Sequence, residues 1–212
     1  MSSSPAALDG FLNPIESRLS CYGLTNSSPI PDSKIRSIVE FAIKNAPSAF
    51  NVQSARAVIL LKADHEKLWD IADKHLKAAM PEPAYQALAP RVKMFRAAYG
   101  SVLWFEDQDA LDALKEKNPA IQASVAEWSH HSSGMHQFIA WTAFELEGLG
   151  CNLQHYNFMP QFSAEVASEW KLPESWKLLS QLVFGTPTDG LKRSRERTYL
   201  PVEDRVKVFG EK

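Results

Sequence analysis

Amide and hydroxyl side chains crowd into one short stretch of the chain, between residues 46 and 54. The stretch reads Ala-Pro-Ser-Ala-Phe-Asn-Val-Gln-Ser and carries Ser48, Asn51, Gln53 and Ser54. It joins the predicted end of a helix to a predicted buried strand. A planar heteroaromatic ring with alternating donors and acceptors would be recognised by such groups. The alternative is a plain turn whose polar side chains bond their own backbone.

An arginine and a serine two residues apart form a second candidate, Arg18-Leu-Ser20. A guanidinium and a hydroxyl at this spacing could hold a phosphate, because both donate hydrogen bonds to its oxygens. The alternative is a solvated arginine at an ordinary helix end. The stretch after Gly185 could add charge to the same phosphate or be a solvated surface segment. Its basic residues are Lys192, Arg193, Arg195 and Arg197.

Nothing in the sequence predicts a metal site. Histidines gather between residues 130 and 136, but there is no HExxH pattern and no Cys/His quartet. Gly148 and Gly150 lack the spacing of a dinucleotide-binding loop, and they close a helix where such a loop would open one. His155 follows this turn, where it could face a ligand or be a satisfied buried histidine.

The elements that must position these residues are short strands and more numerous helices. An apolar stripe at helical spacing runs from Ile35 to Ala46, with Asp32 as its candidate N-cap and Pro47 ending it. The irregular alternation of strands and helices predicts an α+β domain with a small central mixed sheet flanked by helices. Strands are expected at 57–61, 100–105, 151–155 and 177–184, and further helices at 64–78, 83–98, 108–117, 120–149 and 161–171.

The length, composition and nearly neutral charge of the chain predict one globular domain. The 212 residues are 45% hydrophobic and 23% charged with a net charge of −2, which excludes disorder and a basic nucleic-acid-binding surface. Residues 1–10 are expected to form a flexible tail and 11–212 a single domain. We expect no signal peptide, because the N-terminal residues lack a basic start and an apolar run. No apolar run reaches membrane length, and two cysteines suit a reducing compartment. We therefore expect the cytoplasm, or alternatively the nucleus.

Two features indicate a homodimer. The middle of the helix at 120–149 is apolar on every side, which fits the centre of a core or an interface. The segment 185–212 is long for an ordinary loop, and we expect this extension to wrap a partner subunit.

The candidate segments belong to a longer ordered set of motifs, which spans the chain from about residue 12 to residue 210. In order they are Arg18-x-Ser20, Ala46-Pro-Ser-Ala-Phe-Asn-Val-Gln-Ser54, Trp128-Ser, Ser132-Ser-Gly-Met-His-Gln137, Glu147-Gly-Leu-Gly-Cys-Asn-Leu-Gln-His-Tyr-Asn157, Ser175-Trp-Lys-Leu, Gln181-Leu-Val-Phe-Gly185 and Arg205-Val-Lys-Val-Phe-Gly210. This set resembles the nitroreductase family, specifically its small fungal-type members, the fatty acid repression mutant-like group.

The resemblance implies an α+β nitroreductase fold, built as an intertwined homodimer with FMN bound at the dimer interface. It also implies NAD(P)H as electron donor and nitroaromatic or quinone-type compounds as acceptors, in a ping-pong cycle. Because the flavin carries the hydride chemistry, no side chain need act as an acid or base. We therefore expect no catalytic residue in that sense.

The family's site positions divide into a phosphate side and a ring side. The phosphate side is expected at Arg18, Ser20 and Arg197. The strand end that meets the flavin N5 edge, through backbone N–H groups, is expected at Gln154, His155 and Tyr156. The segment of Pro47, Ser48, Ala49 and Asn51 is expected to pack on the ring, usually from the other subunit, with Gln53 beside it. The long helix is expected to add a ring contact from Ser132 or Ser133.

The chain departs from the family pattern at two positions near the phosphate. Leu19 stands where relatives often carry a second basic residue, and Leu200 stands where they often carry a lysine before Pro201. Both changes remove positive charge, for which Arg193 and Arg195 could compensate.

Two other functions stay open, since a fold does not fix a reaction. One is a dedicated FMN-dependent oxidase or dehydrogenase in a secondary-metabolite pathway. The other is a flavin-binding stress-regulatory protein with little turnover.

Overall fold

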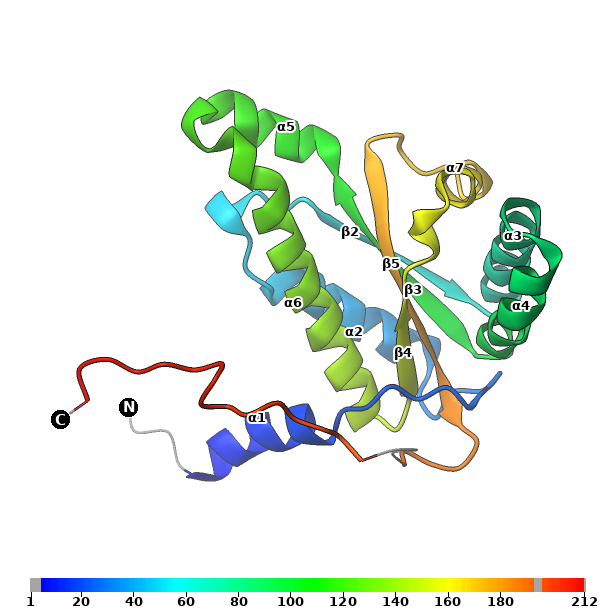
Figure 1. The fold of residues 1–212 in the computed structure, drawn as a ribbon, viewed down its shortest axis with the longest axis horizontal. Helices are drawn as coiled ribbons and strands as arrows, with labels where there is room; N and C mark the ends of the chain where they lie inside the picture. Colours follow the sequence, from blue (N-terminus) through cyan, green and yellow to red (C-terminus); the bar gives the residue numbers. More distant parts are fainter. Residues whose placement is uncertain (1–4, 193–195, 212) are drawn as a thin grey trace.

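A five-stranded antiparallel sheet lies between two layers of helices in the computed structural model, which describes residues 5–192 and 196–211. α2 and α6 cover one face of the sheet, and α3, α4 and α7 cover the other (Figure 1). The strands are β1 (Leu24–Thr25), β2 (Ala55–Leu61), β3 (Gly100–Asp107), β4 (Gly150–Gln154) and β5 (Trp176–Pro187). The α-helices are α1 (Pro5–Ser17), α2 (Asp32–Asn45), α3 (Ala63–Ala79), α4 (Glu82–Arg96), α5 (Gln108–Lys117), α6 (Val125–Leu146) and α7 (Pro160–Glu169). The 3-10 turns are η1 (Ala49–Asn51), η2 (Pro119–Ser124) and η3 (Tyr156–Phe158).

β5 is the centre of the sheet and pairs with β1, β3 and β4, while β3 also pairs with β2. Every strand pairing in the described residues is antiparallel, so the prediction of a mixed sheet is wrong in that respect. The reason lies in the connection between β2 and β3. Two successive helices, α3 and α4, return the chain to Gly100, directly opposite Leu61, whereas a parallel pair needs a crossover to the other end of the sheet.

β3 is buried along nearly all of its length and divides the core into two parts. Leu103 and Phe105 pack with α3, α4 and α7, and Val102 and Trp104 pack with α2 and α6. Burial on both faces explains why this strand reads as a nearly unbroken apolar run.

The helix predicted from Ile35 is confirmed as α2, but its start differs from the expectation. Pro31 precedes the helix, and the Asp32 carboxylate does not cap it. That carboxylate instead accepts hydrogen bonds from Lys62 Nζ (2.9 Å) and the Tyr99 hydroxyl (2.5 Å). The helix predicted at 120–149 is divided, because its first residues form η2 and α6 begins only at Val125.

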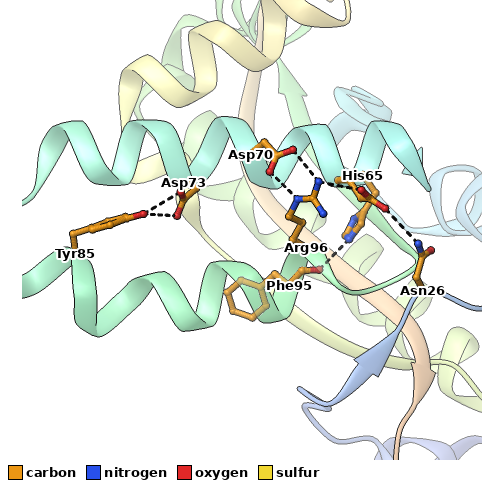
Figure 2. A network of polar contacts seen from close by, with 8 residues as sticks. Asn26, His65, Asp70, Asp73, Tyr85, Phe95 and Arg96 are labelled. Atoms are coloured by element: carbon orange, nitrogen blue, oxygen red, sulfur yellow. Dashed lines mark hydrogen bonds and ion pairs between the residues drawn. The ribbon is translucent and has the colours of Figure 1, made fainter.

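Polar contacts fasten α3 to α4 on the far side of the sheet from α6 (Figure 2). Arg96 Nε donates to Asp70 Oδ1 at 2.7 Å, and the Tyr85 hydroxyl donates to Asp73 at 3.1 Å. The buried ring of His65 lies within hydrogen-bond distance of a backbone carbonyl of α4, and burial lowers the pKa of His65 to about 4. This layer therefore carries a neutral, structural histidine.

The described C-terminal segment begins beside the end of α1, where Asn13 and Glu16 line a hollow together with Arg197 and Tyr199 (Figure 1). α1 begins at Pro5, so residues 5–10, expected to be a flexible tail, are helical. Residues 196–211 form no helix or strand, and the side chain of Phe209 is 93% exposed. Across the described residues, no helix combines the length and apolar character needed to cross a membrane.

Candidate functional site

The segment 47–53, here called the bend, has a strained backbone. Phe50, Asn51 and Gln53 all have left-handed torsions, with φ of 54°, 52° and 51°. Such torsions cost on the order of 1–3 kcal/mol for each residue that is not glycine, and they persist only where surrounding contacts impose them. Two groups of contacts do so here, one at each end of the bend.

α6 holds the first end of the bend. The Ser132 hydroxyl donates to the carbonyl of Pro47 at 2.8 Å, which brings together two predicted site residues from distant parts of the chain. The Ser48 hydroxyl accepts from the backbone N–H of Gln53 at 3.0 Å, so it closes the bend on itself. Ser133 is buried and accepts from Gln137 Nε2 at 3.0 Å. Of the two serines, Ser132 is the one that contacts the bend.

β2 and β3 hold the other end. Arg56 Nη1 donates to the Gln53 carbonyl at 2.7 Å, and the Asp107 N–H donates to the Ser54 carbonyl at 2.9 Å. The Ser54 hydroxyl donates to Glu106 Oε2 at 2.5 Å.

The bend and α6 enclose an aromatic hollow of about 480 Å³. Phe50 stacks on Trp128 with ring centroids 6.1 Å apart and planes 24° apart. The side chains of Asn51 and Gln53 are exposed at the same bend, with Gln53 Nε2 3.5 Å from the Asn51 carbonyl. The hollow is lined by Pro47, Ser48, Ala49, Phe50, Trp128, His131, Ser132 and Met135.

The phosphate candidates lie together, although they come from opposite ends of the chain. Arg197 Nη2 donates to the backbone carbonyl of Arg18. The Arg18 guanidinium lies 4.2 Å from the centre of the Trp141 ring, a cation–π contact. Ser20 is exposed beside them. Arg193 and Arg195 lie outside the described residues.

Leu19 cannot be replaced simply by a phosphate-binding cation. Its side chain packs against the core on the side of α3 and α4, and its backbone N–H donates to the Glu145 carboxylate at 3.0 Å. An arginine at this position would lose this packing or place its charge against apolar side chains. Leu200 is 71% exposed in the C-terminal segment.

The end of β4 places its three predicted residues in different surroundings. The Gln154 amide donates to Asn152 Oδ1 at 2.9 Å. His155 is exposed, so the alternative of a buried histidine is wrong. The Tyr156 N–H donates to Gln181 Oε1 at 2.7 Å, and its side chain is part of the core. This N–H is therefore already engaged within the chain.

The two halves of the candidate site lie toward different ends of α6. The bend contacts α6 at Ser132, and the Arg18 segment contacts it at Trp141 and Glu145. At 1.5 Å per residue, these contacts are roughly 14–20 Å apart along the helix axis. Within the described parts of the chain, no three His, Cys, Asp or Glu side chains gather as they would around a metal ion.

Comparison with known proteins identifies the family. A profile of the nitroreductase family matches residues 15–186. The chain belongs to the nitroreductase family. Nitroreductase FRM2 of Saccharomyces cerevisiae is 36% identical over 180 residues, which cover 84% of this chain and 88% of that protein.

Solved nitroreductases share the fold. CinD of Lactococcus lactis, in complex with nicotinic acid, is 37% identical with a TM-score of 0.85, covering 94% of this chain and 100% of that chain. CinD is also solved with 4-nitrophenol. A structure from Desulfovibrio desulfuricans in complex with FMN is 20% identical with a TM-score of 0.66, covering 99% of this chain and 100% of that chain. The predicted α+β nitroreductase fold is confirmed, and membership makes the chain an oxidoreductase.

Three residues of this nitroreductase were missed in the sequence analysis. Phe50 and Trp128 both lay inside quoted motifs without a role of their own. Glu106 lies one residue beyond the strand predicted at 100–105 and was given no role. Its position at an alternating, inward-facing register was the available signal.

Proposed function

We propose that the chain is an FMN-dependent oxidoreductase that reduces nitroaromatic or quinone-type compounds with NAD(P)H in a ping-pong cycle. One observation carries the proposal. The strained bend leaves the Asn51 and Gln53 amides exposed beside a hollow walled by the stacked rings of Phe50 and Trp128. A planar aromatic ligand with polar edges suits both features. The CinD complex with 4-nitrophenol and the neighbour that binds FMN support it.

The charges of the Arg18 segment fit the phosphate of FMN. A phosphate monoester carries between one and two negative charges near neutral pH, and guanidiniums bind it through charge-assisted hydrogen bonds. Arg18 and Arg197 lie next to one another, with the exposed Ser20 hydroxyl nearby. We therefore assign the phosphate to these three residues.

When bound, FMN would supply the ring that accepts and donates hydride, and the chain would bind and orient that ring. Pro47, Ser48 and Ala49 would pack against it, while the Asn51 and Gln53 amides would hydrogen-bond its polar edge. The end of β4, at Gln154 and His155, would approach the opposite edge. Tyr156 supports this strand end from the core, because its N–H donates to Gln181.

We further propose that two chains complete each site as a homodimer. The bend and the Arg18 segment contact different ends of α6, so a partner's bend could complete the phosphate half of the first chain. Phe11, Phe41, Phe138 and Leu146 are exposed around an apolar hollow of about 570 Å³ between α1 and α6. A second copy of the chain would cover this surface, and the extension 185–212 would wrap it.

The absorption spectrum of the purified protein tests the proposed function. We expect a flavin spectrum, release of FMN and not FAD or riboflavin on denaturation, and bleaching by anaerobic NADH or NADPH. Reoxidation by 4-nitrophenol or a quinone completes the cycle. A colourless protein that also fails to take up added FMN would overturn the proposal. Bleaching by a metabolite but by neither nucleotide would favour a dedicated oxidase, and bound flavin without turnover would favour a regulatory protein.

A further inference from the structure

A buried carboxyl group lies at the end of β3 and belongs to none of the positions assigned above. Glu106 is 1% exposed. By strand alternation it lies on the face of the sheet that α2 and α6 cover, two residues beyond Trp104. Glutamate is rarely buried so completely unless it is paired with a cation.

No cation among the described residues pairs with Glu106. Its Oε2 accepts the Ser54 hydroxyl at 2.5 Å, while its Oε1 is buried without a hydrogen bond to any described residue. Arg56, whose charge acts on the Glu106 carboxyl group, makes its hydrogen bonds elsewhere. Arg56 Nη2 donates to Asp107 Oδ2 at 2.8 Å, and its Nη1 donates to the Gln53 carbonyl.

This arrangement works against the stability of the chain. Burial raises the pKa of Glu106 to about 7, although the Ser54 hydroxyl and the charge of Arg56 act to lower it. A desolvated carboxyl group with a single hydroxyl partner costs folding free energy, and an apolar side chain would pack there without that cost. A role other than core packing would explain why a glutamate occupies this buried position.

Among the described residues, the one hydrogen-bond partner of the Glu106 carboxyl group is the residue that follows the bend. Ser54 is itself 1% exposed, and two groups hold it. Its hydroxyl is held by Glu106, and its carbonyl accepts the N–H of Asp107. Holding one residue through both its side chain and its carbonyl fixes its rotation, and with it the direction of the preceding Gln53.

We propose that Glu106 is a positioning residue for the bend, which acts through the Ser54 hydroxyl to hold the Asn51 and Gln53 amides in the direction that a bound flavin requires. The inference rests on the proposed FMN site. The bend needs such support because Phe50, Asn51 and Gln53 would relax from their left-handed torsions if one end were released. Glu106 does not line the aromatic hollow, so its effect is indirect.

Four variants separate positioning from general stability. Glu106→Leu removes the acceptor, whereas Glu106→Gln keeps a carbonyl oxygen for the Ser54 hydroxyl. Ser54→Ala removes the donor, and the double variant Glu106→Leu/Ser54→Ala tests whether the two act as one unit. Glu116→Gln, at an exposed position of α5, is the control for loss of a carboxylate.

Two measurements are made on flavin-free protein at pH 8. The first is the Kd for FMN from flavin fluorescence quenching, with the melting temperature recorded alongside. The second is the rate of chymotrypsin cleavage after Phe50, which is 63% exposed, followed by mass spectrometry of the fragments. The cleavage rate reports the mobility of the bend whether or not flavin binds.

We expect Glu106→Leu and Ser54→Ala each to weaken FMN binding about tenfold, which is the effect of losing one buried hydrogen bond. The double variant should lose no more FMN affinity than either single variant. Both should be cleaved faster after Phe50, without a matching fall in melting temperature. Glu106→Gln should keep both its FMN affinity and its resistance to cleavage within about twofold of wild type.

Equal FMN affinity and equal cleavage in Glu106→Leu and wild type would overturn the positioning role. The role would also be overturned if Glu106→Gln lost as much FMN affinity as Glu106→Leu, or if the losses of affinity only followed the fall in melting temperature. A wild-type protein that binds no FMN would overturn the proposed function instead. In that case the cleavage rates would still decide whether Glu106 holds the bend.

Discussion

Arg18 is the residue on which the phosphate half of the proposed site depends most directly. A charge-assisted hydrogen bond contributes roughly 1.5–3 kcal/mol. Arg18→Ala should therefore weaken FMN by about 10- to 150-fold while riboflavin, which has no phosphate, loses little. Flavin fluorescence titration with both ligands measures the difference. Arg36→Ala is the control, because Arg36 is exposed and pairs only with Glu40 at 3.5 Å among its recorded ion pairs.

Equal losses of FMN and riboflavin in Arg18→Ala would contradict this assignment. They would mean that the stacking of Arg18 on Trp141 supports the local fold, and that Arg197 is the next residue to substitute.

The raised pKa of Glu106 makes the stability of the fold depend on pH. The folded state keeps the proton up to about pH 7, whereas the unfolded chain releases it near pH 4.5. Stability should therefore fall as pH rises from about 4.5 to 7, by roughly 3 kcal/mol at most, because one pKa unit corresponds to about 1.4 kcal/mol. Urea denaturation of wild type and Glu106→Gln at pH 5, 6 and 8 tests this. The difference between the two proteins should shift in favour of Glu106→Gln as pH rises, and a constant difference would contradict it.

Residue types predicted where polar groups gather, but they did not predict which of these groups already form hydrogen bonds within the chain. The amides of the bend stand exposed as expected, yet the Ser48 hydroxyl is taken by Gln53 and the Tyr156 N–H by Gln181. Leu19 was judged by charge alone, and its side chain is part of the core packing. Each of these partners is set by the folded backbone, so local patterns could not reveal it.

At the scale of elements, α6 is the support of the bend, and the serine pair gives a matched test. Ser132 donates to the Pro47 carbonyl, whereas Ser133 accepts from Gln137 within α6. Ser132→Ala should weaken FMN by about five- to tenfold, the usual effect of one hydrogen bond, and Ser133→Ala should leave it within about twofold. Isothermal titration with FMN measures both. If Ser133→Ala lost as much FMN affinity as Ser132→Ala, the loss would come from the packing of α6 and not from its contact with the bend.

The strands and helices were largely predictable, but their pairing was not. The strand expected at 100–105 is confirmed and extends to Asp107, where Ser54, just before β2, and Arg56, within β2, supply side-chain partners for Glu106 and Asp107. Those partners lie about fifty positions earlier in the chain. The antiparallel direction of β2 and β3 likewise depends on how α3 and α4 turn between them, which periodicity does not report.

At the scale of the whole molecule, the chain has an apolar surface that none of its described residues covers. The hollow between α1 and α6 is bordered by Phe11, Phe41, Phe138 and Leu146. In the described part of the C-terminal segment, side chains such as Tyr199 and Phe209 are also exposed. Large exposed patches of this kind mark interfaces, and a stable dimer buries on the order of 2,000 Å² or more.

We therefore expect wild-type protein to be a dimer at micromolar concentration, and we expect this dimer to be required for tight flavin binding. Phe138→Glu places a charge in the apolar hollow and should weaken the dimer at least tenfold, because a buried unpaired charge is costly. Deletion of residues 191–212 should do the same by removing most of the extension 185–212, and only its dimer strength is compared, because the deletion also removes Arg197. Ala113→Glu, at an exposed position of α5, is the control for added charge. Sedimentation over a dilution series, with FMN content measured in each fraction, follows assembly and flavin together. A wild-type monomer that is folded and retains FMN would show that one chain suffices for the site, and the division of the bend and the phosphate between two subunits would then be wrong.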